Sequence, residues 1–293
     1  MDIATFLIQC LNAVQYGLLL FLVASGLTLI FGSMGVINLA HGSFYMIGAY
    51  MAYALAPAVE QYLGGGFFTT LAVGIVLSVL LGYLLEWVFF SYLYEREHLQ
   101  QVLMTYGLIL VFEELRSILV GNDVHGVPAP DWLAGTIRLG DVMTYPVYRL
   151  FISAVCIAVA LGMWAVLTRS RLGMRIRAGA SNREMVRAMG IDIRLLYRLV
   201  FAIGVALAAL AGMIAAPVSS VYPNMGAQVL IICFVVVVIG GIGSIKGALV
   251  AALLVGFVDT FGKVLFPAMA GISVYLLMAL MLLWKPEGLF KAG

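Results

Sequence analysis

The sequence has very little charge. Only 10% of its 293 residues are charged and 64% are hydrophobic, whereas an ordinary soluble domain is about 25% charged. The mean hydropathy is +1.10. A chain this apolar cannot cover its surface with side chains that suit water, so the composition predicts residence in a lipid membrane. No basic patch is interleaved with exposed aromatic residues, which argues against nucleic acid as a partner.

Cysteine is also scarce. The three cysteines, Cys10, Cys156 and Cys233, all lie within apolar runs. They have neither the spacing of metal ligands nor the even number that a disulfide framework needs. We therefore interpret them as small buried apolar residues and expect no metal site.

Catalytic patterns are missing as well. The sequence has no nucleophile elbow and no paired carboxylates of a hydrolase, and it has no Walker A loop. The nearest approach, Gly262-Lys263, is followed by Val264, and Phe257 stands where the first glycine should be. We expect neither enzymatic activity nor a cofactor. If this chain uses ATP, another polypeptide must hydrolyse it.

Long apolar segments dominate what is present. A helix that crosses a membrane needs about 20 mostly apolar residues. The expected fold is an all-α, polytopic integral membrane protein, with one transmembrane domain over residues 1–293 and eight or nine transmembrane helices. The nine candidate segments are Phe6–Phe31, Asn38–Leu55, Phe68–Tyr92, Val102–Val120, Val147–Leu167, Leu199–Ala216, Ala227–Ile239, Ala248–Phe266 and Ile272–Trp284.

Half of the basic residues gather in one loop, residues 168–198. Cytoplasmic loops of membrane proteins carry the excess of Lys and Arg, so this loop is expected on the cytoplasmic side. Alternation along nine segments then places the N-terminus outside and the C-terminus inside. If one short segment is re-entrant, eight crossings remain and the N-terminus lies inside. The eight arginines are Arg169, Arg171, Arg175, Arg177, Arg183, Arg187, Arg194 and Arg198.

The longest connection on the opposite side is residues 121–146, rich in glycine and proline. Loops of this length are usually functional or disordered. Trp132 and Leu133 within it suggest a folded cap. Two interpretations stay open, a docking surface for an outside partner and a passive lid.

A short helix is expected inside the basic loop, over about residues 182–189. Ser181 and Glu184 have the spacing of a capping box, and Gly190 supplies a stop signal. A helix of two turns is too short to be stable alone, so it should be held by a partner or lie on the membrane surface. Its apolar face comprises Met185, Ala188 and Met189, and another face carries Arg183 and Arg187.

A polar segment opens the second apolar run. Asn38 is placed to cap the helix, and His41 and Tyr45 follow within it. A helix start offers unpaired amides and a positive dipole end to a carboxylate ligand. The alternative is packing, with Asn38 acting only as a cap.

Charges inside apolar segments are the other candidates for a polar pathway, because they are costly in a membrane. Glu113 lies near Arg116 on the fourth segment. Asp259 and Lys263 are four residues apart on the eighth, which suits an ion pair on one helix face. The alternative role for each is structural pairing.

Two glycine motifs resemble each other. GSMGV follows the first apolar segment at 32–36, and GGIGS follows the seventh at 240–244. Two related halves would suit a transporter, although glycine is common in membrane helices.

Several motifs together resemble the permeases of branched-chain amino acid ATP-binding cassette (ABC) importers, the LivH-like branch. The similarity runs nearly from end to end of the chain. The motifs are GLTLIFG at 26–32, VINLAHG at 36–42, RLGMRIRA at 171–178, REMVRAMGI at 183–191, GGIGSIKG at 240–247 and LWKPEGLF at 283–290.

The resemblance implies an importer of the bacterial inner membrane, moving hydrophobic branched-chain amino acids inward. Two permease chains, usually different, would pair with two ATPase subunits inside and a soluble substrate-binding protein outside. Residues 182–190 would form the coupling helix seated on an ATPase, with contacts from Arg183, Glu184, Met185, Arg187, Ala188, Met189 and Gly190. The alternative is a secondary transporter or channel for a small amide, urea or an aromatic acid that works without ATP.

Overall fold

The computed structural model describes residues 3–94, 96–139 and 143–290. Helices account for most of these residues. The two strands of the described chain form one antiparallel hairpin, in which Thr136 pairs with Pro146 and Leu139 with Met143. The elements are α1 (Ile3–Met34), α2 (His41–Leu63), α3 (Phe67–Val88), η1 (Phe90–Tyr92), α4 (His98–Val120), η2 (Asp131–Leu133), β1 (Thr136–Leu139), β2 (Met143–Pro146), α5 (Val147–Arg169), α6 (Arg171–Ser181), α7 (Arg183–Ala188), α8 (Ile193–Ser219), α9 (Met225–Gly240), α10 (Ile245–Leu265), η3 (Pro267–Met269) and α11 (Ala270–Trp284).

Six of the nine apolar segments identified in the sequence fall wholly within a helix, and the other three, Asn38–Leu55, Phe68–Tyr92 and Ala248–Phe266, overlap a helix and extend beyond it. By length and composition, six helical segments of the described chain could cross a membrane, and the shorter α9 is also apolar. The expectation of a mainly helical, polytopic protein is therefore confirmed. The six segments are Ile3–Met34, Phe67–Tyr92, Val147–Arg169, Ile193–Ser219, Ile245–Leu265 and Pro267–Trp284.

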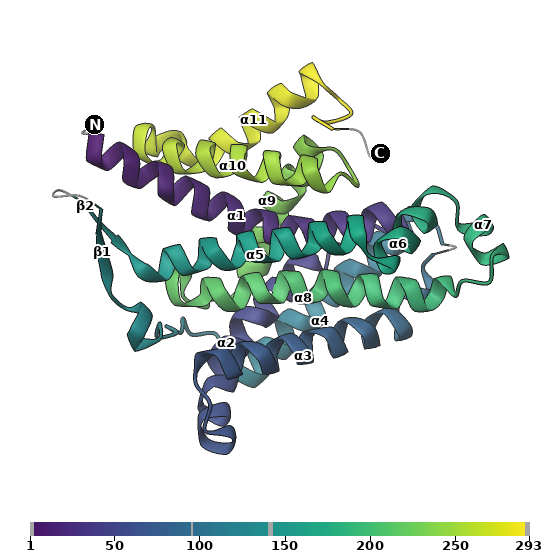
Figure 1. The fold of residues 1–293 in the computed structure, drawn as a ribbon, viewed down its shortest axis with the longest axis horizontal. Coiled ribbons are helices and arrows are strands. Elements are labelled where there is room, and N and C mark those ends of the chain that lie inside the picture. Colours follow the sequence, from purple (N-terminus) through teal and green to yellow (C-terminus); the bar gives the residue numbers. More distant parts are fainter. Residues whose placement is uncertain (1–2, 95, 140–142, 291–293) are drawn as a thin grey trace.

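Helix α1 is the central element. It packs against α10, α8 and α5, while α2 and α3 pack on α8. Figure 1 shows the N-terminus and the β1–β2 hairpin at one end of the bundle, with α6 and α7 at the other. We call these the hairpin end and the α7 end.

Small residues allow the central helices to approach closely, as is common in membrane bundles. A Cβ atom on Gly48 of α2 would lie 2.0 Å from the carbonyl oxygen of Ala209 on α8. One on Gly26 of α1 would lie 2.6 Å from the carbonyl oxygen of Gly204. No side chain fits in either place, so glycine sets the spacing of α1 and α2 from α8.

The two glycine motifs meet in space. A Cβ atom on Gly32, near the end of α1, would lie 3.0 Å from Cα of Gly243, in the turn before α10. Gly35 and Gly243 have φ angles of +67° and +82°, which favour glycine. The end of α1 is thus packed on the start of α10, while an internal repeat stays a prediction.

The loop at residues 121–146 is folded over the hairpin end, apart from residues 140–142, which lie outside the described residues. His125 and Val221 exchange two backbone hydrogen bonds of 2.9 and 2.8 Å. The His125 ring stacks on Tyr53 at 4.3 Å, and Trp132 lies 5.5 Å from Phe68. These contacts tie the loop to α2, α3 and the connection between α8 and α9.

Candidate functional site

Helix α7 begins and ends close to the expected residues, but its cap differs. Helix α6 continues to Ser181, so Ser181 cannot act as a cap. Asn182 has an extended backbone, and its side chain accepts a hydrogen bond of 2.9 Å from the Met185 amide. The capping box that we expected between Ser181 and Glu184 is therefore wrong. Gly190, with φ of +79°, terminates the segment as expected.

The apolar side chains of α7 divide into two groups. Val186 is buried beneath the helix, whereas Met185 and Met189 are 61% and 73% exposed. Ala188 and Gly190 are exposed beside them. Val186 packs the helix against the rest of the chain, while the methionine side stays largely exposed among the described residues. A helix of six residues with such a face is suited to binding a partner.

Arg183 connects α7 to the central helix. Its guanidinium donates a hydrogen bond to the carbonyl oxygen of Met34, the last residue of α1. The same group lies 5.6 Å from the centre of the Tyr197 ring on α8. A displacement of α7 would therefore act directly on the end of α1. Arg183, Glu184 and Arg187 line a cavity, and Met185 and Met189 are not among its lining residues.

The polar residues near the start of α2 are buried. Ala40 takes the N-cap position and no side chain caps the helix, so the expected cap by Asn38 is wrong. Asn38 lies too far ahead, where its carbonyl accepts a hydrogen bond from the His41 amide. His41 Nε2 lies 3.0 Å from the Val23 carbonyl oxygen of α1, and Tyr45 is buried.

The Asn38 side chain stands out in this group. It is completely buried, and neither its oxygen nor its nitrogen has a hydrogen-bond partner within the described chain. Most buried polar groups in proteins are hydrogen-bonded. Among the predicted pathway residues, both polar atoms of the Asn38 side chain and the Nδ1 atom of His41 are thus left unsatisfied by the described chain.

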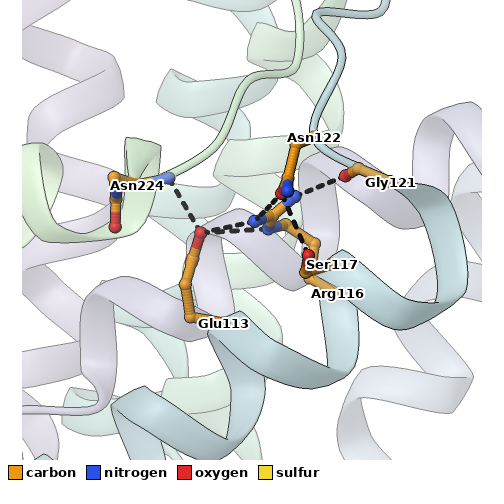
Figure 2. Close-up of polar contacts among 6 residues, drawn as sticks. All are labelled: Glu113, Arg116, Ser117, Gly121, Asn122 and Asn224. Atoms are coloured by element: carbon orange, nitrogen blue, oxygen red, sulfur yellow. Dashed lines mark hydrogen bonds and ion pairs between the residues drawn. The ribbon is translucent and has the colours of Figure 1, made fainter.

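Glu113 and Arg116 belong to a network at the end of α4 (Figure 2). Arg116 pairs with Glu113 at 2.9 Å and donates to the Gly121 carbonyl oxygen and to Asn122. Glu113 also accepts a 3.0 Å hydrogen bond from the backbone amide of Asn224. The network joins α4, the loop that follows it and the start of α9. Sequence reasoning could not predict the contact with Asn224, which is distant in the chain.

Asp259 and Lys263 form the expected ion pair, with Lys263 Nζ 2.6 Å from Asp259 Oδ2. The Asp259 side chain is nearly buried, whereas that of Lys263 is 60% exposed. Lys263 also lies 5.6 Å from the centre of the Tyr16 ring on α1. Lys263 is in the last turn of α10, where a cation is favoured by the helix dipole, and Asp259 lies one turn earlier.

Sequence reasoning missed one ion pair. Glu86, buried on α3, accepts hydrogen bonds from Arg198 of α8 at 3.1 Å and from the Tyr94 hydroxyl. Burial, and then the hydrogen bond to Glu86, raise the pKa of Tyr94 well above its ordinary value, which keeps the phenol protonated as a donor. In the sequence Arg198 is one of the eight arginines of the basic loop, and only its position beside α3 identifies it as the partner of Glu86. Among the described residues no cluster of His, Cys, Asp and Glu could hold a metal ion.

Known proteins resemble this chain over nearly its whole length. The high-affinity branched-chain amino acid transport system permease protein BraD of Pseudomonas aeruginosa is 30% identical, over 98% of this chain and 96% of BraD. LivH of Escherichia coli K12 is 28% identical, over 97% of this chain and 95% of LivH. LivM of the same strain is 27% identical, over 90% of this chain and 66% of LivM.

A family comparison agrees with these relatives. The family described as "Branched-chain amino acid transport system / permease component" matches residues 9–284. The match covers the central helices, the loop at the hairpin end and α7. This chain therefore belongs to the branched-chain amino acid transport permease family.

Proposed function

We propose that the chain is the membrane-spanning subunit of an ABC importer that moves branched-chain amino acids into the cytoplasm. The names of its relatives BraD and LivH support this substrate class. The observation that carries the proposal is α7, a capped helix with two exposed methionines whose Arg183 contacts the end of α1. This arrangement would transmit a partner's movement into the bundle.

The ATP would be hydrolysed by a separate subunit, because the sequence has no Walker A loop. Met185, Ala188 and Met189 would enter a groove of that ATPase. Its motion would pass through Arg183 to Met34, and then through the contact of Gly32 with Gly243 to α10. This route is one of physical contact between packed elements.

The proposed orientation places the α7 end in the cytoplasm and the hairpin end outside. Nine crossings then leave the N-terminus outside and the C-terminus inside, which agrees with the arginine-rich loop at the α7 end. A soluble substrate-binding protein would dock over the folded loop at 121–146. The membrane would be the bacterial inner membrane, with a second permease chain as neighbour, as the similarity to LivM supports.

Asn38 is the proposed substrate contact on the pathway, beside His41 and Tyr45. Its buried amide can donate to a carboxylate and accept from an ammonium group, which suits an amino acid. Glu113 and Asp259 are already paired with Arg116 and Lys263. Their pairing supports a structural role for these charges.

The test of coupling replaces the exposed methionines by a charge. In the complete transporter, Met185→Asp with Met189→Asp should abolish ATP-driven leucine uptake and weaken co-purification of the ATPase, because a desolvated carboxylate is costly in an apolar groove. Met174→Asp is the matched control, since Met174 is 60% exposed on the neighbouring α6. Normal uptake by the double variant would refute the assignment of α7.

A second measurement separates the importer from an ATP-independent transporter. The permease in vesicles should import leucine only with its ATPase and ATP present. Uptake by the chain alone, driven by an ion gradient, would contradict the proposal.

A further inference from the structure

A cavity at the α7 end lies outside the proposed ATPase contact of Met185, Ala188 and Met189, although Arg183 of the proposed coupling route lines it. Its volume is about 380 Å³, and it lies between the end of α3 with η1, the helix α7 and the start of α8. Four arginines line it, from α7 and α8. This concentration of positive charge in one hollow indicates a site for an anion.

Carboxylate groups of the same chain already neutralise part of this positive charge. Arg198 pairs with the buried Glu86, and Glu184 contributes one negative charge to the lining. Arg183 is engaged with the Met34 carbonyl oxygen, which leaves its charge uncompensated. The cavity therefore keeps a net charge of about two positive units, from four arginines against two carboxylates.

Two of the arginines are available to a ligand. Within the described residues, the guanidinium groups of Arg187 and Arg194 have neither an ion pair nor a hydrogen bond. Arg187 projects from α7 and Arg194 from the first turn of α8, so they approach the cavity from different elements. Asp192 caps the α8 amides through its own side chain and does not line the cavity. Guanidinium groups bind phosphate oxygens with favourable, often bidentate geometry.

The remaining wall is aromatic. Trp87 and Tyr92, at the end of α3 and in η1, line the cavity and are 55% and 73% exposed. Tryptophan and tyrosine are enriched at the membrane–water interface, because their rings are apolar and carry one polar group. Arginines next to such aromatics at the ends of spanning helices are typical of sites for lipid head groups.

We propose that this cavity binds the phosphate group of an anionic phospholipid, held between Arg187 of α7 and Arg194 of α8. The same chemistry would accept a free phosphate, which the experiment distinguishes. A bound phosphate would join α7 to α8 across the cavity. The proposal is independent of ATPase docking, because the exposed Met185 and Met189 lie outside the cavity lining.

The test measures lipid retention by native mass spectrometry of the purified full-length permease. The probes are phosphatidylglycerol, phosphatidylcholine and inorganic phosphate. Wild type should retain phosphatidylglycerol in preference to phosphatidylcholine. Arg187→Gln with Arg194→Gln should weaken that binding about thirty-fold, as expected for two surface arginines.

The matched control is Arg175→Gln with Arg177→Gln, which removes two exposed arginines from α6, outside the cavity. The control should bind phosphatidylglycerol as wild type does. Wild type and both double variants should unfold with the same Tm. Displacement of phosphatidylglycerol by millimolar inorganic phosphate would support the phosphate site and identify the free anion as its ligand. Equal weakening by both double variants, or no preference over phosphatidylcholine in wild type, would overturn the proposal.

Discussion

Glu113 of α4 accepts a hydrogen bond of 3.0 Å from the backbone amide of Asn224, 111 residues further along the chain. Asn224 has a φ angle of +61°, a left-handed conformation that asparagine tolerates better than most residues. The carboxylate thus holds the residue from which α9 begins. Because Glu113 also pairs with Arg116, one side chain fixes both the end of α4 and the start of α9.

Glu113→Gln should therefore destabilise the protein. The amide can still accept from Asn224, but Arg116, which is nearly buried, loses its negative partner. Since Glu113 is 24% exposed, we expect a cost of about 1–2 kcal/mol, below the range for fully buried pairs. The measurement is the Tm of the purified protein. Glu114→Gln removes the neighbouring, exposed carboxylate, and equal Tm values for the two variants would disprove the role of Glu113.

Arg183→Lys should impair coupling while leaving the ATPase bound. Lysine keeps the charge but cannot reproduce the guanidinium hydrogen bond to Met34 together with the contact on Tyr197. Loss of a charged hydrogen bond predicts roughly a tenfold fall in uptake per ATP hydrolysed. Arg175→Lys on α6 is the control. Unchanged uptake per ATP in Arg183→Lys would exclude transmission through this residue.

Gly48→Ala should prevent folding. The added Cβ would lie 2.0 Å from the Ala209 carbonyl oxygen. Because this oxygen belongs to the backbone, it can move away only if α2 separates from α8. Gly107→Ala on α4 is the matched substitution, because nothing lies within 4 Å of its Cβ position. It should be tolerated, and alanine even favours helix by about 1 kcal/mol. The amount of folded permease in membranes is the measurement, and similar yields would argue against close packing of α2 on α8.

Tyr94→Phe should remove a pH dependence of stability. The pKa of Tyr94 is raised above the ordinary value of 10.0, so the folded state holds this proton more tightly than the unfolded state. Its contribution is complete below about pH 10 and is lost as the pH rises further toward the folded pKa.

The difference in Tm between wild type and Tyr94→Phe should then shrink above pH 10. Tyr92→Phe serves as the control, since Tyr92 is 73% exposed. A difference that stays constant to pH 11 would contradict a raised pKa of Tyr94 in the folded protein.

The sequence alone was sufficient for the helical class, the apolar segments and the Asp259–Lys263 pair. Hydrophobic runs of about 20 residues and contacts four residues apart are local properties, readable without knowledge of the fold. The N-cap of α7 is a local feature that the sequence predicted wrongly by one residue. Ser181 was expected as the cap, but α6 extends to Ser181 and Asn182 takes the cap position. Such boundaries depend on how neighbouring helices compete for the same residues.

Tertiary structure decided which distant residues meet. It paired Glu86 with Arg198, brought Arg183 to the end of α1, and divided the α7 residues between an exposed methionine side and an arginine-lined cavity. The hydrophobic pattern of the sequence cannot predict these contacts, because they arise from the packing of helices that are about a hundred residues apart in the chain. The sequence thus determined that this is a membrane protein with a basic loop. The packing determined what that loop contacts.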